Sequence, residues 1–243
     1  MKNIFIFIPI ILLPWFCSAF TLVTTNPDFL GWQDPEILFN VNTANCPASM
    51  DIPGLITDAV KVWNNVATSR VKISYNGSTT STVTGNPTTV YCEPNFQGVT
   101  GADQNYVPAA ALPTPSGNYV ATGLLYLNVS GGSANISGFD RSLLLVIIAH
   151  EVGHILGLGH SQDPNALMYY NASAKTHLAL AQDDIDGVSY LYPRNELGQD
   201  KMMGCGLVTT VGSPRPPSGG MFAVVLALML LPLAIYGGLR KAA

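Results

Sequence analysis

Three histidines and a glutamate at fixed spacing are the residues of this sequence best placed to do chemistry. His150 and His154 are four residues apart, and His160 follows six residues later. Residues four apart share one face of a helix, so two imidazoles can point at one metal ion. Gly157 lies between the second and third histidines, and glycine adopts backbone angles that let a helix end and the chain turn back. The spacing therefore predicts three nitrogen ligands around one ion.

Three protein ligands leave one position of a tetrahedral zinc open for water, which is typical of a catalytic site rather than a structural one. Glu151 directly follows the first ligand and is not needed to bind the ion. Its carboxylate can take a proton from a zinc-bound water as the water attacks a carbonyl, and can pass that proton to the leaving amine. We predict one catalytic Zn2+ held by His150, His154 and His160, with Glu151 as the general base. A lone histidine on an apolar helix is usually an ordinary core residue. Here that explanation would have to hold for three histidines at once, so the spacing favours a metal site.

Several elements must position these residues. The range 141–156 is almost wholly apolar up to the histidines, which predicts a helix through the middle of the core. Residues 52–66 carry apolar side chains at helical spacing, which predicts an amphipathic helix. A last helix is predicted over 183–192, because this range begins with acidic residues, which the helix dipole favours in the first turn. Short strands are predicted at 36–41, 71–75 and 121–129, and the range 78–118 has loop composition with one strand around 88–92.

Both ends of the chain carry apolar segments. Residues 1–19 have a positive start, a short apolar run and small residues at the end, which predicts a signal peptide. Residues 221–239 carry no charge and are long enough for a transmembrane helix that places the main domain outside the cytoplasm. A sorting signal that is cut away is the alternative to a permanent anchor. We predict a catalytic domain over 20–195, a Pro/Gly-rich linker over 196–220 and a basic tail over 240–243.

Charge and cysteine content narrow the class of protein further. The 243 residues have a net charge of -4 and only 11% charged residues, so the basic footprint of a nucleic-acid binder is missing. Cys46 and Cys92 lie in the exported domain, where a disulfide between them is the default, and Cys205 is left over. We expect a monomer whose partners are protein or peptide substrates and, through the C-terminal helix, a membrane.

The extended motif from His150 to His160, followed at once by Ser161, resembles that of the matrixins, a family of metzincin zinc peptidases. The ranges 163–169 and 180–192 are similar to the Met-turn and the final helix of the same family. This resemblance implies an α+β fold. Its catalytic domain would have a twisted, mainly parallel sheet with two long helices, followed by a small C-terminal subdomain with the Met-turn and the final helix.

The same resemblance implies roles for individual residues. Met168 would form a hydrophobic floor beneath the zinc, and Asp183 and Asp184 would support that floor by hydrogen bonds to the Met-turn. Ordinary packing for Met168, and helix-start charges for the two aspartates, are the alternatives. The strand near 124–128 would pair with an extended substrate.

The sequence also departs from the family. Tyr170 stands where matrixins have proline, so the segment resembles the Met-x-Tyr of astacins and serralysins, in which the tyrosine can be a further zinc ligand. A tyrosine in the pocket wall is the other interpretation. Only four histidines are present, which argues against a second, structural zinc, and His177 lies alone. The residues leave the question of calcium open.

We predict a zinc-dependent endopeptidase that hydrolyses peptide bonds of extracytoplasmic proteins. One rival is a surface adhesion protein on an inactive peptidase scaffold, which would be expected to lose Glu151 or a ligand. The other rival is a zinc hydrolase of a non-peptide amide, which would share the site without needing a cleft lined by a strand.

Overall fold

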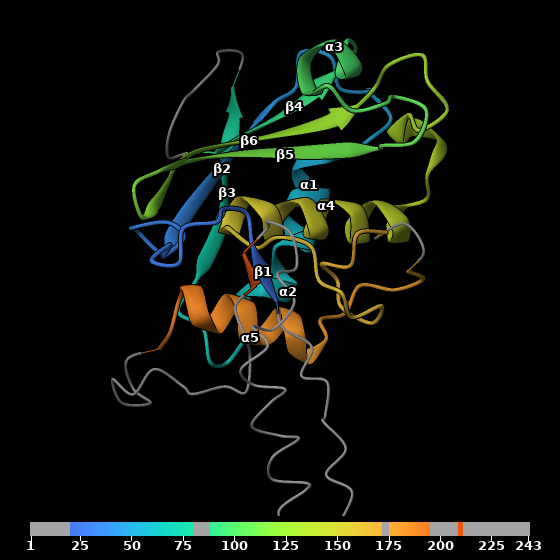
Figure 1. The fold of residues 1–243 in the computed structure, drawn as a ribbon. Helices are drawn as coiled ribbons and strands as arrows, with labels where there is room; N and C mark the ends of the chain where they lie inside the picture. The colour runs from blue at the N-terminus through green and yellow to red at the C-terminus, as the bar shows by residue number, and fades with distance from the viewer. Residues whose placement is uncertain (1–19, 80–87, 172–174, 195–208, 211–243) are drawn as a thin grey trace, which may run out of the picture. The chain divides into compact units, whose positions relative to one another are not determined.

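The computed structural model describes residues 20–79, 88–171, 175–194 and 209–210 (Figure 1). The expected signal peptide (1–19), basic tail and transmembrane segment (221–239) lie outside the described residues, as does the linker apart from 209–210. Within the described part of the chain, no helix has the length and apolar character needed to cross a membrane.

The described elements alternate between strands and helices along the chain. The strands are β1 (Thr21–Leu22), β2 (Glu36–Asn42), β3 (Lys72–Thr79), β4 (Thr88–Glu93), β5 (Ala109–Ser116), β6 (Tyr119–Asn128) and β7 (Thr209–Thr210). The helices are α1 (Ile52–Ala59), α2 (Lys61–Asn64), α3 (Phe96–Thr100), the short 3-10 turn Ile136–Gly138, α4 (Arg141–Leu156) and α5 (Gln182–Leu191).

Five strands form one sheet in the order β3-β2-β4-β6-β5. The pairs β2–β3, β2–β4 and β4–β6 are parallel, and β5 runs antiparallel to β6 at the edge. The helices α1 and α4 lie on the same side of this sheet, and α5 lies beyond α4 (Figure 1). The mainly parallel sheet that the resemblance implied is therefore confirmed.

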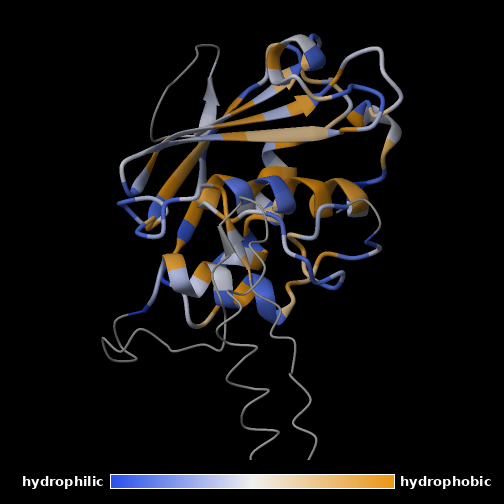
Figure 2. Cartoon of the chain, in the orientation of Figure 1, coloured by the Kyte–Doolittle hydropathy of each residue, from blue (hydrophilic) through white to orange (hydrophobic). Residues whose placement is uncertain are grey.

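The core lies between the sheet and the helix α4. Ten of the sixteen residues of α4 are buried, and most of the helix is hydrophobic (Figure 2). A helix that is apolar on nearly all sides is stable only when neighbours cover it, here the sheet, α1 and the chain around α5. Its bounds are those that the sequence predicted.

Two parts of the predicted secondary structure were wrong. The described part of the range 78–118 is not mainly loop, because it contains α3 and the eight-residue strand β5. Pro113 and Pro115 made β5 look like a loop, but proline is tolerated in an edge strand, where some N–H groups have no strand to pair with. The helix predicted over 52–66 is divided at Val60 into the shorter helices α1 and α2.

A disulfide joins Cys46, in the loop after β2, to Cys92 in β4, with 5.0 Å between the Cα atoms. The pairing expected for an exported domain is confirmed in the structure. The bond ties the loop that leads to α1 directly to the central part of the sheet.

Candidate metal centre and active site

The helix α4 begins and ends where its sequence provides the right caps. The Asp140 side chain accepts a hydrogen bond from the backbone N–H of Leu143 at 2.9 Å, which satisfies one free donor of the first turn. At the other end, Gly157 has a φ of 107°, in the left-handed region that favours glycine. The helix therefore ends at Leu156, two residues after His154, and the chain turns back toward the metal site.

Three aromatic side chains hold α4 by donating hydrogen bonds to its backbone carbonyl groups. The Trp63 indole N–H donates to the carbonyl of Ala149 at 2.9 Å, next to the first histidine. The Trp32 indole donates to Ile155 at 2.7 Å, and the Tyr192 hydroxyl donates to Leu156 at 2.6 Å. Sequence reasoning missed these contacts, because each joins residues between 36 and 123 positions apart.

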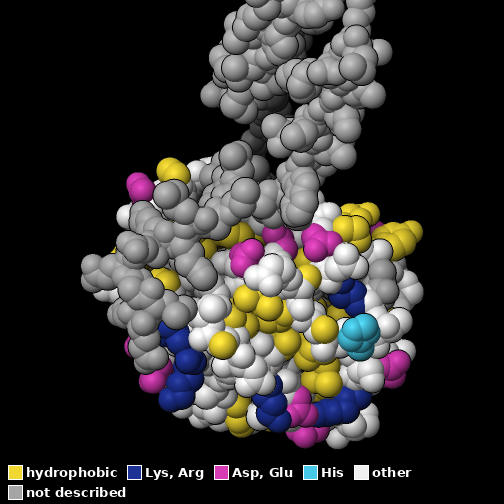
Figure 3. Space-filling view, turned by 90° about the horizontal axis from the view of Figure 1, so that it is seen from below, with side chains coloured by type: hydrophobic (Ala, Val, Ile, Leu, Met, Phe, Trp, Pro, Cys, Tyr) yellow, Lys and Arg dark blue, Asp and Glu magenta, His cyan; other side chains and the backbone are white. Residues whose placement is uncertain are grey.

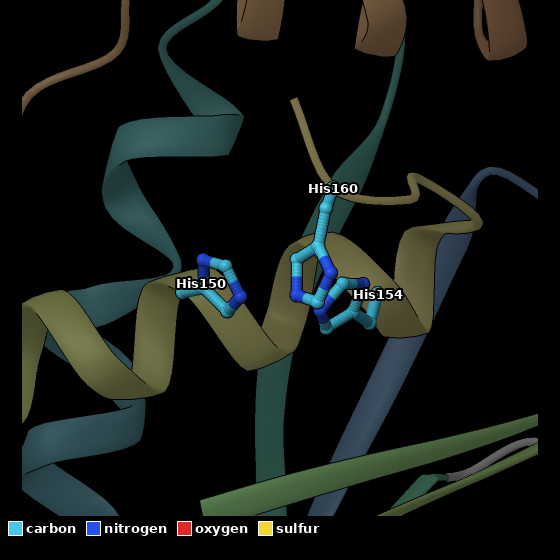
Figure 4. Close-up of side chains that lie close together, drawn as sticks. All are labelled: His150, His154 and His160. Atoms are coloured by element: carbon cyan, nitrogen blue, oxygen red, sulfur yellow. The ribbon is translucent and has the colours of Figure 1, made fainter. Parts of the chain in front are cut away.

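The structure brings the three predicted histidines together on one side of α4 (Figure 4). Each histidine offers one ring nitrogen as a ligand atom, and these three nitrogens lie within 4.8 Å of one another. Nitrogen ligands of a tetrahedral zinc lie about 3.3 Å apart, so small side-chain rotations bring the three onto one ion. This is the one cluster of three or more His, Cys, Asp or Glu ligands found in the described part of the chain.

Two of the rings are oriented by hydrogen bonds from the nitrogen that faces away from the site. His150 Nδ1 lies 2.7 Å from the carbonyl oxygen of Leu167, and His154 Nδ1 lies 2.8 Å from that of Leu158. A carbonyl oxygen only accepts, so each Nδ1 carries the proton and each Nε2 keeps a free lone pair. Such support from a second group fixes the tautomer of a metal-binding histidine.

Burial keeps the ligands in their neutral form. It lowers the pKa of His150 to about 4 and that of His154 to about 3, and it also lowers the pKa of the more exposed His160. Neutral imidazole is the form that binds a metal ion. The donor set of three neutral nitrogens fits zinc, which accepts histidine nitrogen readily.

Glu151 lies on the sheet side of the site. Its Oε2 accepts a hydrogen bond from the backbone N–H of Ala111, in the edge strand β5, at 2.7 Å. Burial raises the pKa of Glu151 to about 8, and the Ala111 N–H opposes that rise. A carboxyl group with a raised pKa is a stronger base once it is ionised, and the role of Glu151 as the general base stays a prediction.

The segment after His160 packs against α4, and its role as a floor beneath the metal stays a prediction. Met168 is buried against α4, where any side chain larger than hydrogen at Gly153 would collide with the Met168 sulfur. The carboxylate of Asp184 accepts backbone N–H groups of Leu167 and Met168 at 2.6 and 2.9 Å. The hydrogen bonds expected between α5 and the Met-turn are thus present.

The neighbouring aspartate has a different partner from the one expected. Asp183 accepts a hydrogen bond from the hydroxyl of Ser161, the residue directly after the third histidine. The Ser161 N–H in turn donates to the carbonyl of Met168 at 2.8 Å. Asp183 therefore supports the loop of the third ligand, whereas Asp184 supports the Met-turn itself.

Tyr170 has its ring against that of Tyr169, with 4.4 Å between the centroids, and is 67% exposed. Its role as a further ligand stays a prediction. His177 lies elsewhere, in a second hollow with Pro164 and Lys175, and does not join the three clustered histidines.

A hollow of about 550 Å³ lies between the histidines and the edge strand. Its lining consists of Val23, Ala111, Leu112, Pro113, Thr114, His154, Gly159 and His160. The strand expected to meet a substrate was β6, but β6 is paired on both sides, to β4 and to β5. That prediction was wrong, because residue pattern alone does not give the order of strands in a sheet. The edge strand beside the metal ligands is β5.

The face of the molecule at the α5 end shows hydrophobic side chains gathered near its middle, with acidic and basic side chains around them (Figure 3). Both signs of charge are present on this face.

Comparison with known proteins shows which family the segment around the site resembles. The Matrixin family model matches residues 101–193, which include β5, β6, α4, the three histidines and α5. Metalloendoproteinase 1 of Glycine max is 50% identical over 60 residues, 24% of this chain and 19% of that protein. Neutrophil collagenase of Homo sapiens is 51% identical over 51 residues, 20% of this chain and 11% of the collagenase.

A longer match is found with Metalloendoproteinase 2-MMP of Arabidopsis thaliana, which is 29% identical over 152 residues, 61% of this chain and 39% of that protein. The chain spans less than two fifths of the length of these curated relatives. Together with the site geometry, the matches identify residues 101–193 as a matrixin-like segment.

Proposed function

We propose that this chain is a zinc-dependent endopeptidase that cleaves proteins outside the cytoplasm. The observation that carries the proposal is the convergence of three neutral histidine nitrogens, with Glu151, the residue after the first histidine, hydrogen-bonded to the edge strand β5 that lines the same hollow. The similarity to metalloendoproteinases and collagenases supports peptide bonds as the substrate class.

The histidines and Glu151 have different roles in the proposed reaction. His150, His154 and His160 would hold one Zn2+, which when bound lowers the pKa of water and stabilises the charge that develops on a carbonyl oxygen. Glu151 takes the proton of the attacking water and passes it to the leaving nitrogen of the cleaved bond. Because the carboxyl group is already hydrogen-bonded to the backbone of β5, it is fixed next to the hollow that a substrate would enter.

The edge strand offers a way to bind an extended substrate. β5 pairs with β6 on one side, and Ala111 directs its N–H away from β6 toward Glu151. A peptide in the hollow would lie along this free edge, in the manner of an added strand. That arrangement favours unfolded or extended segments of proteins over small amides.

Location outside the cytoplasm rests on two features. The disulfide between Cys46 and Cys92 is typical of proteins that fold in an oxidising compartment. Residues 1–19 and 221–239 have the patterns of a signal peptide and of a membrane or sorting segment. We propose an exported protein that is anchored at the cell surface, or released after its C-terminal segment is cut.

A broad library of fluorogenic peptides tests this function directly. We expect the full chain to cleave some of them, and expect cleavage to stop in Glu151→Ala and after zinc is chelated, returning when zinc is restored. Small non-peptide amides should not be hydrolysed. Zinc binding without cleavage of any peptide would instead favour the adhesion protein on an inactive scaffold.

A further inference from the structure

The N-terminal segment Phe20–Val23 lies against the loop that carries the third histidine. Leu22 and Leu158 form an antiparallel bridge. The N–H of Val23 donates to the carbonyl of Gly157 at 3.0 Å, and the N–H of Gly159 donates to the carbonyl of Thr21 at 2.7 Å. A segment far away in the sequence thus adds a short strand along the chain between the end of α4 and His160.

The Thr21 side chain makes one further contact in this pairing. Its hydroxyl donates a hydrogen bond to the backbone carbonyl of His160, with 2.8 Å between the oxygen atoms. The hydroxyl occupies the space beside Gly159 so fully that a Cβ on that glycine would collide with it. Gly159 is therefore the residue that permits Thr21 to reach the backbone of the third ligand.

The segment is firmly anchored on both sides of Thr21. Leu22 is completely buried, and Phe20 is 9% exposed, with its ring 5.4 Å from that of Tyr190 in α5. Phe20 also fills the space beside Gly187, where a Cβ would meet it at 3.1 Å. The hydroxyl of Thr21 is thus held by a packed segment rather than by a loose terminus.

His160 needs such support more than the other two ligands do. The rings of His150 and His154 are each oriented by a hydrogen bond from Nδ1 to a carbonyl oxygen. No equivalent bond to the His160 ring is found among the described residues, and His160 is more exposed than the other two. Its position depends on its backbone, which is held from one side by the Ser161 N–H bonded to Met168 and from the other by Thr21.

We propose that Thr21 is a positioning residue for the metal site, which acts by fixing the backbone of His160 through its hydroxyl group. This inference rests on the proposed function, because it assumes that the three histidines bind one zinc ion. It adds a residue outside the matched range 101–193 to the machinery of the site.

Zinc affinity measured by competition with a chromophoric chelator tests this role without any need for activity. The full chain would be compared with Thr21→Val, which keeps the shape and removes the donor, and with Thr21→Ser, which restores the donor. Removing a group that orients a metal ligand typically weakens metal binding about 10- to 100-fold. We expect at least a tenfold weaker zinc affinity for Thr21→Val and an affinity close to wild type for Thr21→Ser.

Thr57→Val is the matched control. The Thr57 hydroxyl donates to the carbonyl of Pro53 in α1 at 2.8 Å. Thr57→Val therefore removes a hydrogen bond of the same kind and length, at a position away from the metal ligands. Thermal unfolding of the zinc-free proteins would show what each substitution costs in stability alone. Zinc affinity should fall for Thr21→Val and stay unchanged for Thr57→Val.

The outcomes separate this inference from the proposed function. Equal zinc affinity for wild type and Thr21→Val would overturn the role of Thr21 and leave the metal site intact. Failure of the wild-type chain to bind zinc would overturn both. Should Thr21→Val not fold, Thr21→Ala takes its place, since it only removes atoms, and the same comparison of zinc affinities applies.

Discussion

The backbone N–H of Ala111 donates a hydrogen bond to the carboxyl group of Glu151, with 2.7 Å between nitrogen and Oε2. This contact joins the predicted general base on α4 to the strand at the edge of the sheet. It fixes one oxygen of the carboxyl group and leaves the other available for a proton transfer.

Substitution of Ala111 by proline removes this donor. Because the N–H points at Glu151 rather than at β6, the pairing of β5 with β6 should survive the change. We expect kcat/KM to fall about tenfold, in line with the loss of one positioning hydrogen bond of about 1.5 kcal/mol. Steady-state kinetics with bound zinc measured in parallel checks this, and Ala111→Gly is the control that keeps the N–H. Unchanged kinetics in Ala111→Pro would show that the contact does not matter for catalysis.

Asp184 should be the most sensitive residue of α5. Its two oxygens accept N–H groups from Leu167, Met168 and Ala181 at 2.6, 2.9 and 2.8 Å. Asparagine would turn an NH2 group toward these donors, so Asp184→Asn should lower the free energy of unfolding by about 2–4 kcal/mol. Urea unfolding measures this. Asp186→Asn, at an exposed position of the same helix, should cost less than about 0.5 kcal/mol. Similar values for the two variants would contradict the role of Asp184.

The buried side chain of Asn128 holds the loop before β5 and the loop after β6. Its amide donates to the carbonyl groups of Gln104 and Val107, both at 2.9 Å, and its oxygen accepts the N–H and the hydroxyl of Ser130. Asn128→Ala leaves these groups without partners and should cost about 2–3 kcal/mol of stability. The exposed Asn76→Ala serves as the control in the same urea experiment. A loss below about 1 kcal/mol would mean that water replaces the amide.

The motif of the metal site could be predicted from the sequence because its residues lie within eleven consecutive positions. The spacing of His150 and His154 on a helix, and the glycine that ends it, are local properties. The bounds of α4 follow for the same reason, since one stretch is apolar from end to end.

What could not be predicted comes from residues far apart in the sequence. The edge position of β5 depends on which strands pair, and the prolines in β5 are also typical of loops. Thr21 reaches His160 across 139 positions, and nothing in its own neighbourhood indicates that contact. Trp32 and Tyr192, which hold the end of α4, are likewise ordinary core residues when read in sequence alone.

The pH dependence of stability should show the ion pairs that Asp58 in α1 makes with α2 and with the start of α4. Asp58 bonds to Lys61 and to Arg141, and these hydrogen bonds lower the pKa of Asp58 below its ordinary value of 3.8. A carboxyl group with a lowered pKa in the folded state stabilises the protein above its unfolded pKa, and this contribution disappears as the pH falls through the folded pKa.

Asp58→Asn should therefore be less stable than wild type at pH 6, and the two proteins should become equal in strong acid. Because the groups are exposed, the difference should be small and should shrink in high salt. Thermal unfolding at a series of pH values between 2 and 6 measures it. A constant difference across that series would show that the carboxylate charge is not the cause.

The central claim is that three histidines hold one zinc ion and that Glu151 performs the proton transfer beside it. Metal content and peptide cleavage measured together on wild type, Glu151→Gln and His154→Ala test it most directly. We expect one zinc per chain with cleavage in wild type, and one zinc with cleavage reduced at least about 100-fold in Glu151→Gln. His154→Ala should lose both the zinc and the cleavage. Full cleavage by Glu151→Gln, or a tightly bound zinc in His154→Ala, would contradict the account.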